Sequence, residues 1–456
     1  MPLGIYKTYD KMKDSGVEWI GMIPKGWEIK RIKSLALSPV SLFLDGDWIN
    51  SPDISDSGIR YFTTGNVGQG FFKEQGNGYI TAETFDRLGC TMVHAGDLII
   101  SRLNEPIGRA CIIPAHYDDC IVAVDNVILR PDAVYCKKFL MYCMSSDRYA
   151  EYTALLARGT TMHRISRTQL GNIPLPIPPL SEQENIAFYL DEKCAVIDDI
   201  ITEAKASIEE YKAWKASVIF EAVTKGLDPN AEMKDSGVEW IGKIPKDWDV
   251  VPLKRYYDYS NGAAVRVGPF GSALTSSDIT TEEGIIVYNQ RTVLDNNFET
   301  NATFVTPAKA EELTSFGVFP DDILITTRGS IGKIVIVPKN APYGILHPCI
   351  IRFRVDEGKM DKRLLKYIFN NTTLIQQQIL YHSNSTTIDV LYSYTLKELV
   401  LPLIPKHEQN EIVLYLNKKC SAIDGIITEK EALIAELETY KKSLIFETVT
   451  GKRRVC

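Results

Sequence analysis

The chain has 456 residues, which is long enough for two or three domains. Hydrophobic residues make up 45% of the sequence and charged residues 24%, as in ordinary globular proteins. No apolar run approaches the roughly 18 residues of a membrane-spanning helix, and the net charge of −7 argues against a nucleic-acid binder that relies on its overall electrostatic field.

The acidic surplus is unevenly distributed. Segment 181–225 carries ten acidic residues and five lysines, whereas segment 34–180 carries fifteen acidic and twelve basic residues. Any contact with DNA must therefore come from a local basic patch.

The nine cysteines are scattered, without a Cys-x-x-Cys pair, and are not clustered with the six histidines. We therefore expect neither a disulfide framework nor a metal site. Residues 1–10 lack the basic segment and apolar core of a signal peptide, so we expect a cytoplasmic protein.

An internal duplication is the strongest feature of the sequence. Residues 12–21 read MKDSGVEWIG, and residues 233–242 repeat these ten letters without a change. Both copies continue into Ile-Pro-Lys-x-Trp, which ends at Trp27 and Trp248. Two copies of a domain in one chain suggest pseudo-twofold symmetry, as in a fused dimer. In each half, matching segments at the two ends (the frames) enclose a segment that differs between the halves (the insert). The alternative, a neutral tandem duplication, would not spare the frames while the inserts diverge.

The first insert has a mixed α/β pattern. Gly96-Asp97 precedes an apolar run at 98–100, and a second run follows at 111–114. Short β-branched runs bounded by Gly and Pro predict two strands. We expect a short helix near 137–156, followed by a polar loop at 158–164.

A Pro-rich loop at 174–179 and a long helix close the first half. Ser181 and Glu184 form a capping box at the expected start of this helix. Gly226 and Pro229 predict its end, and a helix of about 40 residues would be about 60 Å long.

Apolar residues recur along this helix at steps of four and three, which predicts a coiled-coil seam. The seam consists of Ile197, Ile201, Ala204, Ile208, Tyr211, Val218 and Ala222, with a break at Lys215.

The second half repeats this organisation. EQNEIVLYLNKKC at 408–420 matches EQENIAFYLDEKC at 182–194, at an offset of 226. Strands are expected at 323–325 and 335–338, a short helix near 361–380, a polar loop at 384–387 and a Pro-rich loop at 402–405. The second seam consists of Ile423, Ile426, Leu433, Leu437, Tyr440 and Leu444, with a break at Lys430.

The two apolar stripes are each other's obvious partners. The second helix must run back to pack on the first, so the pair is expected to be antiparallel; pairing between two chains is the alternative. We predict the α+β class: two tandem mixed α/β domains at 12–175 and 233–400, joined by a long antiparallel helix pair from regions 176–228 and 401–456.

Over nearly its whole length, the sequence resembles the specificity subunits of Type I restriction-modification systems. The resemblance is carried by the duplicated MKDSGVEWIG motif, the Pro-rich segment before Glu182-Gln183, the bridge FEAVTKGLDP at 220–229 and VGPFGS at 267–272. The first insert lacks the Gly-Pro-Phe-Gly-Ser opening and has LDGDW at 44–48 instead, so its recognition loops are expected to differ in detail.

The resemblance implies that each insert is a target recognition domain for one half of a bipartite, asymmetric site in double-stranded DNA. It also implies that the helices set the unread gap and dock two methyltransferase subunits, which bind S-adenosylmethionine and methylate adenine. Restriction subunits would add nuclease activity. The chain itself would have no catalytic residue and no cofactor.

Candidate DNA contacts are Arg, Lys, His, Asn, Gln, Ser and Thr residues in the polar loops and near the strand ends, because such side chains bind phosphates and base edges. In the first insert they are Arg60, Asn66, Arg102, Asn104, Arg109, Arg158, Thr160, Thr161, His163 and Arg164. In the second they are Arg266, Ser272, Gln290, Arg291, Arg328, Ser330, Lys333, Asn384, Thr386 and Thr387.

Three other functions each fit part of the sequence. Asp321 followed by Glu357-Gly358-Lys359 mimics a metal-nuclease pattern, but the first half has no matching acidic-x-Lys partner. A self-contained methyltransferase would need a Gly-rich cofactor loop and an Asn-Pro-Pro-aromatic motif, which the sequence lacks. A coiled-coil adaptor would explain the helices but not two large, divergent inserts.

Overall fold

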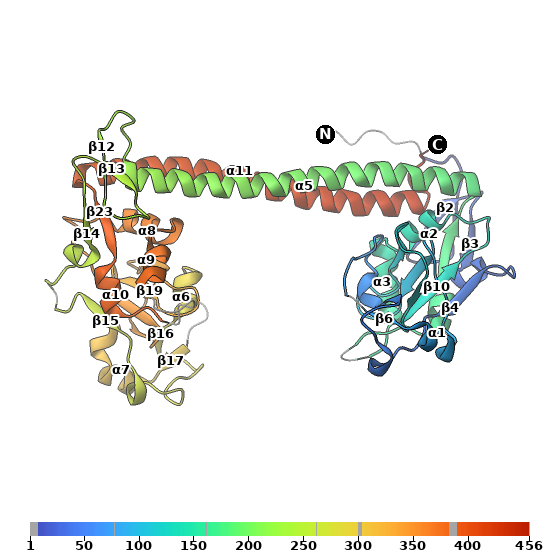
Figure 1. The fold of residues 1–456 in the computed structure, drawn as a ribbon, viewed down its shortest axis with the longest axis horizontal. Helices are drawn as coiled ribbons and strands as arrows, with labels where there is room; N and C mark the ends of the chain where they lie inside the picture. Colours follow the sequence, from blue (N-terminus) through green and yellow to red (C-terminus); the bar gives the residue numbers. More distant parts are fainter. Residues whose placement is uncertain are drawn as a thin grey trace. The chain divides into compact units, whose positions relative to one another are not determined.

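The computed structural model describes residues 8–76, 78–159, 162–260, 262–299, 303–382 and 390–455. The chain forms two compact units. Unit 1 comprises Met1–Ala204 and Glu431–Cys456, and unit 2 comprises Lys205–Lys430. Each unit contains one mixed α/β domain and part of both long helices, α5 (Leu180–Lys225) and α11 (Lys406–Val449), drawn green and red in Figure 1. The predicted boundaries at 176 and 401 separate helices from domains, whereas each compact unit also includes the helix segments that pack on its domain.

Unit 1 is built on a four-stranded antiparallel sheet and a three-stranded sheet. The larger sheet has the order β4 (Leu42–Asp45), β10 (Asn126–Arg130), β7 (Leu98–Ser101), β8 (Ala110–Ile112), and the smaller β6 (Tyr79–Ile80), β5 (Ile59–Phe62), β9 (Cys120–Val122). Two-stranded pairs join β1 (Met12–Asp14) to β2 (Met22–Pro24) and β3 (Glu28–Arg31) to β11 (Pro174–Ile177). The shorter helices are α1 (Ala82–Leu88), α2 (Lys137–Cys143), α3 (Asp147–Leu156) and α4 (Arg167–Gly171), with 3-10 turns η1 (Ile32–Leu35), η2 (Ser51–Asp53) and η3 (Thr64–Asn66).

Unit 2 repeats this plan and adds one strand. Its sheets have the orders β15 (Val265–Val267), β22 (Ile350–Phe353), β19 (Ile323–Thr326), β20 (Ile334–Ile336), and β17 (Thr303–Val305), β16 (Ile285–Tyr288), β21 (Gly344–Leu346), β18 (Gly317–Val318). The strand pairs are β12 (Met233–Asp235) with β13 (Lys243–Pro245) and β14 (Asp249–Pro252) with β23 (Val400–Leu403). The shorter helices are α6 (Gln290–Leu294), α7 (Pro307–Glu312), α8 (Lys362–Asn371), α9 (Leu374–His382) and α10 (Ser393–Glu398), with 3-10 turns η4 (Leu253–Tyr256), η5 (Gly271–Ala273) and η6 (Thr314–Phe316).

The predicted turn-strand-loop-strand elements are confirmed as β7–β8 and β19–β20. Each predicted short helix is instead a pair of helices, α2 with α3 and α8 with α9. The interruptions fall at hydroxyl residues: Ser146 precedes α3, and the Thr372 hydroxyl donates to the Ile368 carbonyl and accepts from the Leu374 N–H. Such side chains compete with the helix ladder and favour helix starts.

The predicted Pro-rich loops are partly strands. Pro174–Ile177 pairs with β3, and Val400–Leu403 pairs with β14. Proline is tolerated in two-stranded pairs because a strand with only one neighbour needs only alternate N–H groups for its ladder. Helix α5 begins at Leu180, so Ser181 lies in its first turn and is not the predicted N-cap.

In each unit, α5 and α11 run antiparallel, as predicted. In unit 1, the Lys441 ammonium lies 2.6 Å from the Asp198 carboxylate. In unit 2, Lys215 lies 2.6 Å from Asp424, and Lys430 stands over the Tyr211 ring. The two ion pairs are equivalent at the 226 offset. The predicted break in the first seam at Lys215 is therefore an ion pair between the helices.

The seam of α11 differs from the prediction at three positions, the first being Ile426, because the neighbouring Ile427 is the buried residue. Leu433 and Tyr440 are 43% and 38% exposed, whereas Ile434 and Leu437 pack against the core of unit 1. Steps of three and four can be drawn through either Leu433 or Ile434, and only the packed partner helix distinguishes them.

A buried glutamine at the start of each long helix ties it to its domain. The Gln183 side chain accepts from the Cys136 N–H at 2.8 Å and donates to the Pro178 carbonyl at 2.8 Å. Gln409 accepts from the Asp361 N–H at 2.7 Å and donates to the Ile404 carbonyl at 2.9 Å. These bonds satisfy backbone groups that no helix or strand partner reaches.

The duplicated Trp residues serve the same junctions. The indole N–H groups of Trp27 and Trp248, both buried, donate to the carboxylates of Glu182 and Glu408, respectively. The repeated IPK-x-W motif and the repeated Glu-Gln pair therefore contact each other, through the hydrogen bond from Trp to Glu.

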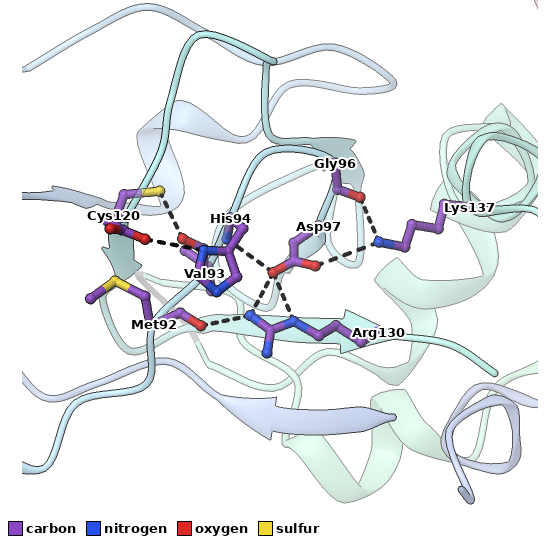
Figure 2. A network of polar contacts seen from close by, with 9 residues as sticks. Met92, Val93, His94, Gly96, Asp97, Cys120, Arg130 and Lys137 are labelled. Atoms are coloured by element: carbon purple, nitrogen blue, oxygen red, sulfur yellow. Dashed lines mark hydrogen bonds and ion pairs between the residues drawn. The ribbon is translucent and has the colours of Figure 1, made fainter. Parts of the chain in front are cut away.

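An ionic network fixes the turn before β7 (Figure 2). Asp97 is 4% exposed, and its carboxylate accepts from Arg130 Nε at 2.8 Å and Nη2 at 2.6 Å. Lys137 lies 3.5 Å from the same carboxylate and donates to the Gly96 carbonyl. Burial alone would raise the pKa of Asp97, but the bonds from Arg130 and the His94 N–H lower it overall.

Asp97→Asn is expected to lower the free energy of unfolding at pH 7 by about 2–3 kcal/mol, because Arg130 loses its buried partner. The pKa of Asp97 is lower in the folded than in the unfolded chain, so its contribution is present above about pH 4 and is lost at lower pH. The wild-type and variant stabilities, measured by urea unfolding, should therefore converge below about pH 4. The exposed Asp118→Asn is the matched control and should change stability by less than about 0.5 kcal/mol.

Within the described ranges, no helix is long and apolar enough to cross a membrane.

Candidate nucleic-acid interface

Three segments of unit 1 meet at one site. They are the η3 turn, the β7–β8 turn itself and the described residues 162–164 of the polar loop. The Arg109 guanidinium joins the first two, donating to the carbonyls of Thr64, Leu103 and Asn104. The third is joined through the Asn104 N–H, which donates to the His163 carbonyl at 3.0 Å.

In unit 2, the β19–β20 turn lies beside Leu391 and α6. The Leu391 N–H donates to the Thr327 carbonyl, as the Ile165 N–H does to the Arg102 carbonyl in unit 1. Gly329 has a φ of +60°, and Asn104 at the matching place has a φ of +57°. Both turns therefore need a left-handed residue, which Gly and Asn supply. A Cβ at Gly329 would lie 3.3 Å from the Gln290 side-chain nitrogen, which places α6 beside this turn.

The starts of η3 and α6 are built alike. Thr63 and Asn289 are the N-caps, and each forms a capping box with the third residue of its turn, Asn66 and Thr292. This pairing makes Gln290 the counterpart of Thr64. The backbones of the two sites thus match, while the side chains that they present differ.

An arginine cluster lies at the unit 1 site. Arg102 is 4% exposed, lies 3.0 Å from Asp45 and donates to the Ile165 carbonyl. Arg164 lies 2.6 Å from Asp125, and Arg167 lies 3.5 Å from Asp45. Burial lowers the pKa of Arg102, and the two carboxylates oppose that change. Three guanidinium groups share two carboxylates, so the cluster keeps a surplus positive charge.

Several candidate DNA contacts have internal partners. The Arg60 guanidinium donates to the carbonyls of Gln75, Gly76 and Gly78, and the buried Asn66 amide donates to those of Lys73 and Gln75. These contacts stabilise the loop that follows η3. Arg102 and Arg109 are also buried and stabilise their turns from within.

Two candidates of unit 2 are also engaged within the fold. Lys333 donates to the Asn370 carbonyl at 2.7 Å, and burial lowers its pKa. Arg266 lies over the Phe316 ring. Such contacts position the backbone, and any DNA contact from these side chains stays a prediction.

The other candidates are reachable from solvent. The exposed ones are Asn104, Arg158, His163, Arg164, Ser272, Arg291, Arg328 and Ser330, and Gln290 is partly exposed. All but Ser272 lie on the three-segment sites. His163 also lies 2.8 Å from Glu105. Thr160, Thr161, Asn384, Thr386 and Thr387 lie outside the described residues.

Sequence reasoning missed the carboxylates of the arginine cluster and the true counterpart of Arg102. Asp45 comes from the LDGDW segment, where the first insert departs from the family pattern, and Asp125 precedes β10. The strand registers align Arg102 with Thr327 and Leu103 with Arg328. An alignment of the apolar runs 98–100 and 323–325 already contained this register.

The nuclease-like pattern has another explanation. Asp321 and Glu357 both contact the Lys362 ammonium, at 3.6 and 2.6 Å, and Lys359 pairs with Asp356. Over the described ranges, no three His, Cys, Asp or Glu side chains are grouped to hold a metal ion. The cysteines of those ranges are free thiols.

Arg158→Ala combined with Arg164→Ala is expected to weaken DNA binding and to reduce its salt dependence. If both side chains contact phosphates, the slope of log K against log salt falls by about 2. The measurement is a binding titration at several salt concentrations. The control is Arg87→Ala with Lys138→Ala, which removes two exposed cations from α1 and α2. Unchanged affinity at low salt would contradict the assignment.

The chain is similar to known proteins over most of its length. A family model described as "Type I restriction modification DNA specificity domain" matches residues 24–210 and 268–439. The putative type I restriction enzyme MjaX specificity subunit of Methanocaldococcus jannaschii is 25% identical over 96% of both chains.

Two solved structures share the fold. A chain of the structure titled "Structural basis underlying complex assembly and conformational transition of the type I R-M system" superposes with a TM-score of 0.71 at 15% identity, covering 94% of this chain and 98% of that one. The HsdS subunit from Thermoanaerobacter tengcongensis superposes with a TM-score of 0.54 at 16% identity, covering 96% and 99%.

Proposed function

Because the chain belongs to the family of type I restriction modification DNA specificity domains and is a specificity subunit of such a system, we propose that each unit recognises one half of a split, asymmetric DNA site. One observation carries the proposal: in both units the turn after the first strand of the β7–β8 or β19–β20 pair lies beside a similarly capped turn, on similar backbones, but the exposed side chains there differ. Similar backbones position the two sites in the same way, and different exposed side chains select different bases.

The helices supply the spacing in this proposal. Helix α5 is continuous for 46 residues and α11 for 44. Paired continuous helices are stiff, unlike a flexible linker. A split site requires its two readers to be held at a defined number of base pairs. We therefore assign the unread gap between the half-sites to the helix pair.

The helices also offer equivalent surfaces to a partner. Phe188, Val196 and Ile200 of α5 are exposed in unit 1, and Leu414 and Tyr415 of α11 are exposed in unit 2. Phe188 and Leu414 are equivalent at the 226 offset. Exposed apolar side chains on a helix indicate a protein interface. We propose that two methyltransferase subunits dock on these surfaces, one on each unit.

The chemistry belongs to the partners in this proposal. The methyltransferase subunits would bind S-adenosylmethionine and methylate adenine, and restriction subunits would add cleavage. This chain then contributes recognition and assembly, and its own carboxylates and cysteines have structural roles.

The proposal predicts that cells expressing this chain with its methyltransferase carry methylated adenine in one split, asymmetric motif. Replacement of residues 268–400 by the same region of a relative with another specificity should change one half of the motif and leave the other. Genome-wide mapping of N6-methyladenine measures both results. The methyltransferase alone is the control. Methylation without sequence preference would contradict the proposal and favour a structural adaptor.

Val196→Glu combined with Ile200→Glu is expected to remove one methyltransferase subunit from the complex. The two side chains lie four residues apart on one helix face, and carboxylates there would be buried without a partner. Native mass spectrometry measures the subunit count. Ala195→Glu with Thr202→Glu adds the same charges to another exposed face of α5 and should leave the count unchanged. Loss of both subunits from the first variant, or of none, would contradict independent docking.

A further inference from the structure

Two exposed tyrosines stand together in unit 2. Tyr392 and Tyr394 are 53% and 67% exposed, and their rings are stacked, with centroids 5.4 Å apart and planes 9° apart. Large aromatic side chains usually bury most of their surface. A parallel pair left in solvent presents an open aromatic face to a ligand.

The pair belongs to the candidate nucleic-acid interface. Leu391, which precedes it, is buried and donates its N–H to the Thr327 carbonyl at 2.7 Å. The exposed Arg328 follows Thr327 directly, and the turn that begins there lies beside Gln290. The tyrosines therefore adjoin side chains that suit a DNA contact.

The matching positions of unit 1 are different. At the 226 offset, Tyr392 and Tyr394 correspond to Ser166 and Thr168. Ser166 is the N-cap of α4, and its hydroxyl accepts from the Gln169 N–H in a complete capping box. Tyr392 is the N-cap of α10 and makes no such bond. The structure thus places tyrosine where serine would stabilise the helix start.

A local rule broken at an exposed position is typical of a functional site. Tyr392 removes the side-chain cap of the helix, and both tyrosines expose aromatic rings to solvent. Neither change stabilises the fold. Both changes fall where the two recognition sites must differ. The observations favour a role in binding over a role in folding.

We propose that the Tyr392–Tyr394 pair contacts nucleobases of the half-site that unit 2 recognises. The inference rests on the proposed function and names residues that would set its specificity. In the groove of a duplex, an aromatic ring can contact the thymine methyl group and base edges, and that apolar contact needs no charge. In unit 2 the tyrosine pair would contact DNA through apolar ring faces, whereas in unit 1 the arginine cluster would contact DNA through its positive charge.

The test uses the full chain with its methyltransferase and duplexes carrying the motif mapped for the wild type. Tyr392→Ser with Tyr394→Thr introduces the residues of unit 1 and should weaken binding to the intact motif roughly tenfold or more. Binding to a duplex with a scrambled second half-site should change little. Because the serine restores a cap, the variant should melt no lower than the wild type.

Two further variants separate ring contact from other causes. Tyr392→Phe with Tyr394→Phe keeps the rings and should retain binding to within about threefold, because an apolar ring contact does not need the hydroxyl groups. Tyr259→Ser removes another exposed tyrosine of unit 2 and should bind as the wild type does. The salt slope of the Ser/Thr variant should equal that of the wild type, whereas Arg328→Ala should lower it by about 1.

Three results would overturn the inference. The Ser/Thr variant could bind the intact motif as the wild type does, it could lose affinity equally for every duplex, or it could lose the methyltransferase subunit, which would make the tyrosines a protein contact. In each case the wild-type chain still selects its motif, so the proposed function stands. If the wild-type complex selects no motif, both proposals fail.

Discussion

The structure depends on one constraint: neither long helix can leave its apolar stripe in water. In each unit, part of α5 and part of α11 bury these stripes against each other and against one domain. Asp198 with Lys441, and Asp424 with Lys215, then fix the antiparallel register by charge. Because exposed ion pairs contribute little free energy, the apolar contacts stabilise the pair and the charges specify its alignment.

The domains inherit their positions on the helices from buried polar groups. Gln183 and Gln409 each satisfy backbone groups of the domain and of the short link between the Pro-rich strand and the helix. Trp27 and Trp248 complete the same junctions. A buried amide tolerates few orientations because an unmade bond costs more than a made bond contributes. These junctions explain why the frames are alike while the inserts diverge.

The recognition sites show how one backbone can carry two specificities. Arg109 and Lys333 occupy matching places: Arg109 donates to carbonyls of its own turn, and Lys333 joins β20 to α8 by donating to the Asn370 carbonyl. The exposed positions around those turns differ, with Arg164 and His163 in unit 1 and Tyr392 and Tyr394 in unit 2. These internally bonded cations maintain the shape of the site, and the exposed residues vary its chemistry.

The sequence by itself determined the duplication, the two long helices, the strands that follow Asp97 and Asp322, and the family. These features follow from repeats and periodicity, which are local. Tertiary structure decided that Ile434 is packed and Leu433 exposed, and that Pro174–Ile177 is a strand. It also decided that Asn66, Arg102 and Arg109 are buried and that Arg60 donates to carbonyls of its own unit. A polar residue in a loop pattern has the same letter whether it faces solvent or a buried carbonyl, so only the folded chain separates residues that build a site from residues that can touch a ligand.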